Sequence, residues 1–124
     1  MGFDLCGIAE AKSLPSIKEA FLHYISMKYN AEMTFLEKNL DKRFNIDALV
    51  ENAKTVIVLG PSYYPKKIKD NSAYLISKYA YGHDYHHVLK DKAHLLADYI
   101  KEITDCKNYR VFVDTAPLPE KEWG

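Results

Sequence analysis

The chain has 124 residues, and its basic and acidic side chains are equal in number, 17 of each. This length supports one domain, spanning residues 1–124, whose folding buries roughly two-thirds of the surface of the unfolded chain. The charge balance excludes the general basic field that drives nonspecific binding to nucleic acids, so any contact with RNA must be local.

The first predicted elements are a strand over residues 3–9 and a helix. Ser16 and Glu19 match a capping box, in which the serine hydroxyl accepts from the third amide and the glutamate reaches back. A helix is expected from there to about residue 29, with Asn30 at its end. Four apolar residues give this helix one apolar face: Ile17, Phe21, Tyr24 and Ile25.

Shorter elements lead to the clearest strand. Residues 33–39 are predicted to form a short helix, and Asn45 can cap another over residues 46–52. Residues 55–59 are a continuous apolar or β-branched run that a Gly-Pro pair stops. Such a run is typical of a central strand covered on both faces.

An exposed basic loop is predicted at residues 65–71, which carry three lysines. Contact with RNA or a cofactor phosphate is the alternative to simple solvation. Asp84 can cap a long helix that ends near Thr104. Its buried stripe is expected to contain Leu89, Ala93, Leu96, Ile100 and Ile103.

Histidines and tyrosines gather before and within this long helix. His86 and His87 occupy its first turn, where the macrodipole lowers the pKa of an imidazole and favours a neutral, donating or ligating ring. His83 and His87 could share a face if the helix began early, but no third ligand follows, so no metal site is predicted. Five tyrosines suit either the walls around a flat ligand or a semi-polar core. They are Tyr63, Tyr64, Tyr79, Tyr81 and Tyr85.

The last predicted strand stops on a carboxylate. Residues 110–113 suit a buried strand, whereas Asp114 and the Thr-Ala-Pro turn after it cannot continue one. Asp114 should therefore lie at the carboxyl end of a strand, beside the crevice where an α/β sheet binds its ligands. The alternative is that Asp114 only caps the turn by accepting from the following amides. The predicted fold is a single α/β domain with a small central sheet flanked by helices.

Two features limit where the protein acts. Cys6 and Cys106 match no metal-binding spacing, and no signal peptide or long apolar run is present. We therefore expect a reduced, cytoplasmic setting, no association with a membrane, and a monomer.

A family resemblance adds to these patterns. Residues 77–86, a long helix, and then residues 112–117 are together similar to the epoxyqueuosine reductase family. The similarity continues in the same order through Lys42, Arg43 and the Tyr-Tyr-Pro segment after the clearest strand. It implies a cobalamin-dependent, iron-sulfur oxidoreductase of the same fold type as reductive dehalogenases. Such an enzyme converts epoxyqueuosine to queuosine at the wobble position of tRNA.

The resemblance also implies that the chain is part of a longer protein. In that family the matching domain is the cobalamin-binding domain, and a following ferredoxin-like domain carries two 4Fe-4S clusters whose cysteine runs this chain lacks. The isolated chain is therefore expected to be inactive, and the electron donor is unknown. The alternative is a noncatalytic module that binds a corrinoid or docks tRNA.

By position, the resemblance assigns roles to five residues. Asp114 matches the proposed proton donor above the cobalt, and a carboxylic acid suits an epoxide whose oxygen must leave as water. Arg43, Ser77 and Asp114 match positions that line the cobalamin site. Tyr85 and His86, in the same motif as Ser77, are further candidates.

Overall fold

The structure is a computed structural model and describes residues 2–64, 76–114 and 117–123. The chain divides into two compact units, one formed by Met1–Cys6 and Leu59–Lys107 and the other by Gly7–Val58 and Asn108–Gly124. The basic loop predicted at residues 65–71 lies outside the described residues. In the part of the chain that is described, no helix has the length and apolar character to cross a membrane.

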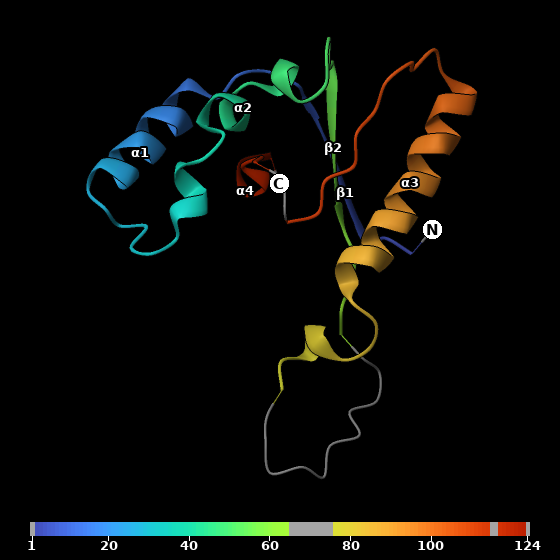
Figure 1. The fold of residues 1–124 in the computed structure, drawn as a ribbon. Helices are drawn as coiled ribbons and strands as arrows, with labels where there is room; N and C mark the ends of the chain where they lie inside the picture. Colours follow the sequence, from blue (N-terminus) through green and yellow to red (C-terminus); the bar gives the residue numbers. More distant parts are fainter. Residues whose placement is uncertain (1, 65–75, 115–116, 124) are drawn as a thin grey trace. The chain divides into compact units, whose positions relative to one another are not determined.

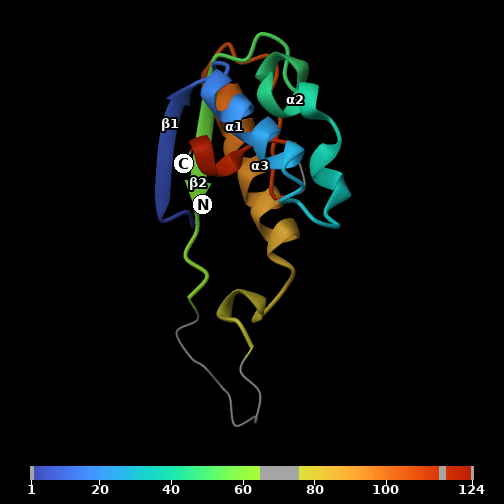
Figure 2. The same ribbon diagram turned by 90° about the vertical axis from the view of Figure 1, so that its left-hand side faces the viewer.

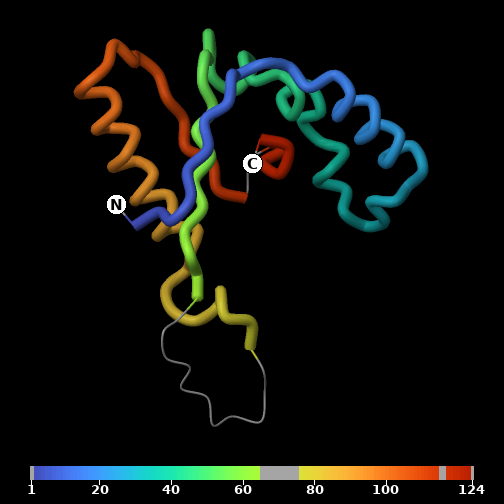
Figure 3. The backbone as a smooth tube through the Cα atoms, turned by 180° about the vertical axis from the view of Figure 1, so that it is seen from behind, coloured from blue at the N-terminus to red at the C-terminus, as the bar shows by residue number. Residues whose placement is uncertain are grey.

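Two strands, β1 (Leu5–Glu10) and β2 (Thr55–Gly60), pair in a two-stranded sheet. The amide of Asp4, just before β1, donates to the carbonyl of Gly60 at the end of β2, at 3.0 Å. The strands therefore run antiparallel, and Figure 3 shows them alongside each other in blue and green. Both strands were predicted in these positions, so these two predictions are confirmed.

Two other predictions about strands are wrong. Within the described sheet β2 pairs with β1 alone, and none of its side chains is fully buried, so it is not a central strand. Residues 110–113 are not a strand of this sheet. Apolar, β-branched residues favour an extended backbone, but a strand also needs a hydrogen-bonded neighbour that local sequence does not specify.

The first helix, α1 (Pro15–Ser26), begins earlier than predicted. Its N-cap is Leu14, which makes no side-chain cap bond, and proline occupies the first position of the helix. Proline suits that position because its ring fixes φ and it has no N–H to satisfy. Ser16 is consequently inside the first turn, and the capping box predicted for Ser16 and Glu19 is wrong.

Beyond the end of α1, Asn30 has a different role from the predicted helix end. Asn30 is 2% exposed, and its side-chain nitrogen donates to Oε1 of Glu37 at 2.8 Å. Glu37 ends a short 3₁₀ helix, η1 (Thr34–Glu37), which replaces the helix predicted over residues 33–39. This hydrogen bond connects the segment after α1 to η1.

The next elements are α2 (Leu40–Phe44) and the 3₁₀ helix η2 (Ile46–Ala48). The side chain of Asn45 accepts from the amide of Asp47 at 3.2 Å, which confirms the predicted cap. The helix that it caps is shorter than the predicted one over residues 46–52.

The remaining helices are η3 (Lys78–Ala80), α3 (Tyr85–Ile103) and α4 (Glu120–Trp123). Figure 1 labels α3 and α4. The long helix is confirmed, and it begins where predicted because Asp84 is its N-cap. The predicted buried stripe is only half-buried, and Ile103 is 62% exposed.

Candidate functional site

The five predicted site residues fall in both units. Ser77, Tyr85 and His86 belong to the unit that contains α3, whereas Arg43 and Asp114 belong to the other. Within each unit, local contacts fix how these side chains are held.

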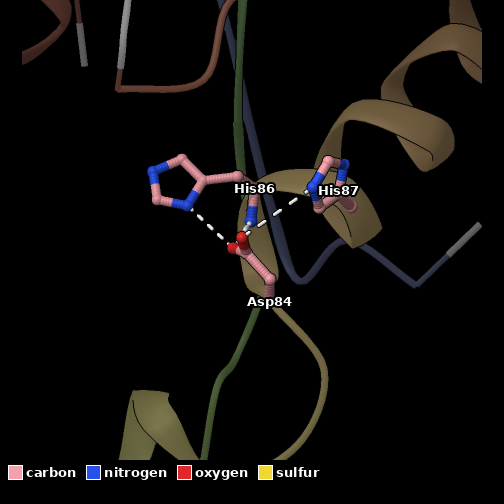
Figure 4. Close-up of polar contacts among 3 residues, drawn as sticks. All are labelled: Asp84, His86 and His87. Atoms are coloured by element: carbon pink, nitrogen blue, oxygen red, sulfur yellow. Dashed lines mark hydrogen bonds and ion pairs between the residues drawn. The ribbon is translucent and has the colours of Figure 1, made fainter.

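At the start of α3 the carboxylate of Asp84 is hydrogen-bonded to His86 and lies near His87, as Figure 4 shows. Oδ1 of Asp84 accepts from the amide of His86 at 2.9 Å, and it also lies 2.8 Å from Nδ1 of the His86 ring. Nε2 of His87 lies 3.9 Å from Oδ2. The hydrogen bond with the His86 side chain is the main cause that lowers the pKa of Asp84. When Nδ1 of His86 donates to Asp84, Nε2 is the acceptor or ligand atom of the ring.

The ring of His86 is also part of a row of aromatic contacts. The ring of Tyr85 stacks on that of His86, with centroids 4.1 Å apart, and Tyr79 meets Tyr85 edge-on at 6.0 Å. Tyr79 is 56% exposed, and Tyr63 and Tyr64 are 70% and 64% exposed. The interpretation of these three tyrosines as core residues is therefore wrong, and they are open to contact with another molecule.

Ser77 directly precedes η3 in the chain. Its side chain is exposed, and its hydroxyl makes no cap hydrogen bond at the start of η3. Nζ of the next residue, Lys78, lies 3.7 Å from the ring centroid of Tyr64. Hydrogen bonding with Lys78, followed by its charge, lowers the pKa of Tyr64.

Arg43, in α2, combines a stacked guanidinium with a buried donor. Its Cζ lies 5.0 Å from the ring centroid of Phe21 in α1, and Phe21 also packs edge-on against the buried Phe44. Figure 2 shows α1 and α2 beside each other. Nε of Arg43 is buried and has no hydrogen-bond partner among the described residues. Burial lowers the pKa of Arg43. A buried donor without an acceptor is costly, which favours a ligand acceptor here.

Asp114 is exposed, and its backbone lies in the left-handed region with φ of 49°. Its amide donates to Oε1 of Glu120 at 3.1 Å. Sequence reasoning missed Glu120, because no local pattern indicates a contact between an amide and a carboxylate six residues further on. The amides that a turn cap by Asp114 would use begin at residue 115, outside the described residues, so that alternative is untested.

The two histidines considered from the sequence as a pair of metal ligands do not lie on one face of a helix. His83 precedes α3, which begins at Tyr85, so His83 and His87 do not share a face of the helix. Within residues 2–64, 76–114 and 117–123, no group of three or more histidine, cysteine, aspartate or glutamate side chains could hold a metal ion.

Within each unit, the residues assigned to a cofactor by the family resemblance carry groups of the kind that cobalamin would need. The corrin carries amide side chains and the cofactor contains a phosphate, all of which accept hydrogen bonds. Arg43 offers a buried N–H that has no acceptor among the described residues, and Ser77 offers an exposed hydroxyl. The stacked pair of Tyr85 and His86 adds an aromatic surface and ring nitrogens.

The Asp84 cap gives a first testable prediction. Replacing Asp84 with alanine removes the acceptor for the His86 amide, so we expect that amide to exchange with solvent roughly fivefold faster. Hydrogen exchange followed by mass spectrometry on the first turn of α3 measures this. The same substitution at the exposed Asp91, in the middle of α3, is the control and should leave that turn unchanged. Equal exchange in both variants would show that Asp84 does not hold the helix start.

The chain is similar to proteins of one family along its whole length. Residues 43–115 match the family described as "Epoxyqueuosine reductase QueG, DUF1730". Over 124 residues the chain is 42% identical to the epoxyqueuosine reductase of Cellulophaga algicola, covering 100% of this chain and 40% of that protein. It is 41% identical to that of Leadbetterella byssophila, covering 100% of this chain and 41% of that protein. The chain thus spans well under half the length of these relatives.

Solved structures that resemble this chain come from the same family. One is an epoxyqueuosine reductase crystallised with an epoxyqueuosine-modified tRNA-Tyr stem loop, with a TM-score of 0.79, 27% identity, and coverage of 94% of this chain and 32% of that chain. Another, from Streptococcus thermophilus, has a TM-score of 0.80, 26% identity, and coverage of 95% and 33%. The α/β fold of this chain is therefore the fold of the matching part of those enzymes. The family match spans more than half of the chain, and the chain belongs to the epoxyqueuosine reductase family.

Proposed function

We propose that this chain is the cobalamin-binding part of an epoxyqueuosine reductase, a cytoplasmic oxidoreductase that reduces epoxyqueuosine in tRNA to queuosine. The observation that carries the proposal is 42% identity, along all of the chain, to a relative of that name. The solved relative that binds a modified tRNA stem loop supports tRNA as the partner.

The reaction defines what the protein must supply. Both carbon–oxygen bonds of the epoxide break, a carbon–carbon double bond forms, and the oxygen leaves as water after taking up two electrons and two protons. Bound cobalamin would supply the electrons at the substrate, fed by two 4Fe-4S clusters in the rest of the enzyme. Asp114 donates a proton to the departing oxygen, which is general acid catalysis by a carboxylic acid.

Two residues are proposed to hold the cofactor. Arg43 donates through its guanidinium to an acceptor on cobalamin, which would satisfy its buried Nε. Ser77 contributes a weaker, uncharged hydrogen bond. Tyr85 and His86, whose rings stack, are proposed as further cofactor contacts.

A noncatalytic tRNA-docking module is the second candidate. The observation that favours it is the exposed pair of Tyr63 and Tyr64, with Lys78 lying over the Tyr64 ring. Exposed aromatic rings beside a cation suit stacking with the bases of a single-stranded loop.

Genetic complementation separates the two functions. The complete gene is introduced into a bacterial strain that lacks epoxyqueuosine reductase, and nucleosides from its tRNA are examined by mass spectrometry. An oxidoreductase restores queuosine, whereas a docking module leaves epoxyqueuosine in place. Persistence of epoxyqueuosine, with the protein present and folded, would overturn the proposal.

The isolated 124-residue chain is expected to be inactive even with cobalamin and a strong reductant. A 4Fe-4S cluster needs four thiolate ligands, whereas this chain has two cysteines, so the electron path is missing. Mass spectrometry of epoxyqueuosine-containing tRNA after incubation measures conversion. Turnover at the rate of the complete enzyme would show that the clusters are dispensable.

A further inference from the structure

Glu120, the first residue of α4, makes a contact that the proposed chemistry does not use. Its Oε1 accepts from the amide of Asp114 at 3.1 Å. Asp114 has φ of 49°, a left-handed conformation that few residues with a Cβ adopt, although aspartate tolerates it better than most. A hydrogen bond from the amide of such a residue helps to fix the direction of its side chain.

The two side chains also interact. Glu120 is half-buried and Asp114 is exposed. Burial raises the pKa of Glu120, and the charge of Asp114 and a side-chain hydrogen bond with it raise that pKa further, against the opposing effect of the Asp114 amide. The Glu120 carboxyl therefore binds its proton more tightly than an isolated exposed glutamate does.

Two charged residues follow Glu120 in α4, Lys121 and Glu122, and both are exposed. Glu122 carries the same charge in the same short helix, two residues further on, which makes it a matched control.

We propose that Glu120 is a positioning residue for Asp114: its carboxylate accepts from the Asp114 amide and so fixes the backbone that carries the Asp114 side chain. This inference rests on the proposed role of Asp114 as the proton donor. It adds Glu120 to the residues on which the reaction depends.

Hydrogen exchange in the complete protein tests the backbone contact without any activity measurement. Glu120→Leu removes the acceptor, so the Asp114 amide should exchange roughly three- to tenfold faster. Glu120→Gln keeps an acceptor oxygen and should leave exchange unchanged, as should Glu122→Leu. Unchanged exchange in Glu120→Leu would overturn the contact.

The pH profile of single-turnover conversion tests whether the charge of Glu120 acts on Asp114. Glu120→Gln keeps the shape of the side chain and its acceptor oxygen but removes its negative charge. The interaction between the two carboxyl groups is then lost, so the decline of conversion at high pH should begin at lower pH. Glu122→Gln should keep the parent profile. An unshifted profile for Glu120→Gln would overturn the interaction between the two carboxyl groups.

The failures of the two proposals are distinguishable. If Asp114→Asn converts substrate at the parent rate, the proposed acid is wrong, whatever the Glu120 variants do. If Asp114→Asn is impaired while neither exchange nor the pH profile responds to Glu120, the acid assignment stands and the positioning role is wrong.

Discussion

Replacing Asp114 with asparagine in the complete enzyme is expected to slow conversion of epoxyqueuosine by roughly 10² to 10⁴-fold, the range for loss of a general acid. Asparagine keeps the size of the side chain and readily adopts the left-handed backbone that Asp114 has, so folding and cobalamin content should survive. The amide cannot deliver a carboxylic proton. Single-turnover conversion of the tRNA substrate, followed by mass spectrometry, measures the loss.

A matched variant and a melting curve separate the acid from the turn residue. Asp41→Asn changes an exposed aspartate in α2 of the same unit and should leave conversion unchanged. If Asp114→Asn melts several degrees lower but converts substrate at an undiminished rate, Asp114 is a structural turn residue. The catalytic role would then be wrong.

Replacing Arg43 with alanine should weaken cobalamin binding about ten- to a hundredfold, corresponding to the 1.5 to 3 kcal/mol of a charged hydrogen bond. The buried Nε, which has no partner among the described residues, is the structural reason to expect an acceptor on the ligand. Equilibrium titration followed by the absorbance spectrum of cobalamin gives the affinity. Ser77→Ala, which removes an uncharged hydroxyl, should weaken binding less.

Arg43 also lies over the ring of Phe21, so its loss can disturb packing as well as binding. Arg43→Lys keeps the positive charge but loses Nε and the planar group, and its affinity should fall between those of the parent and Arg43→Ala. Lys42→Ala removes the neighbouring exposed cation and is the control. Unchanged affinity in both Arg43→Ala and Ser77→Ala would move the cofactor site elsewhere.

Local signals in the sequence predicted the helices best. Asp84 was expected to cap α3, and it does, because a cap depends on a side chain and amides within one turn. The cap by Asn45 was predicted for the same reason. The capping box at Ser16 failed because Pro15 suits the first helical position better and moves the helix start forward.

Contacts between segments that are apart in the sequence could not be predicted from local patterns. Residues 110–113 have strand-like side chains, but membership of a sheet depends on a partner that is remote in sequence. The contact of Glu120 with the Asp114 amide joins residues six positions apart, and no residue pattern indicates it. The family was recognised from the order of several motifs along the chain, which is information that no single pattern contains, and the family match confirms it.

The most direct test of the proposed function is conversion of an epoxyqueuosine-containing tRNA stem loop by the purified complete protein, with a strong reductant, in the presence and absence of cobalamin. We predict loss of one oxygen atom from the modified base, to give queuosine, only when cobalamin is present. Equal conversion without cobalamin would contradict the cofactor assignment. Unchanged epoxyqueuosine with cobalamin bound would contradict the proposed function itself.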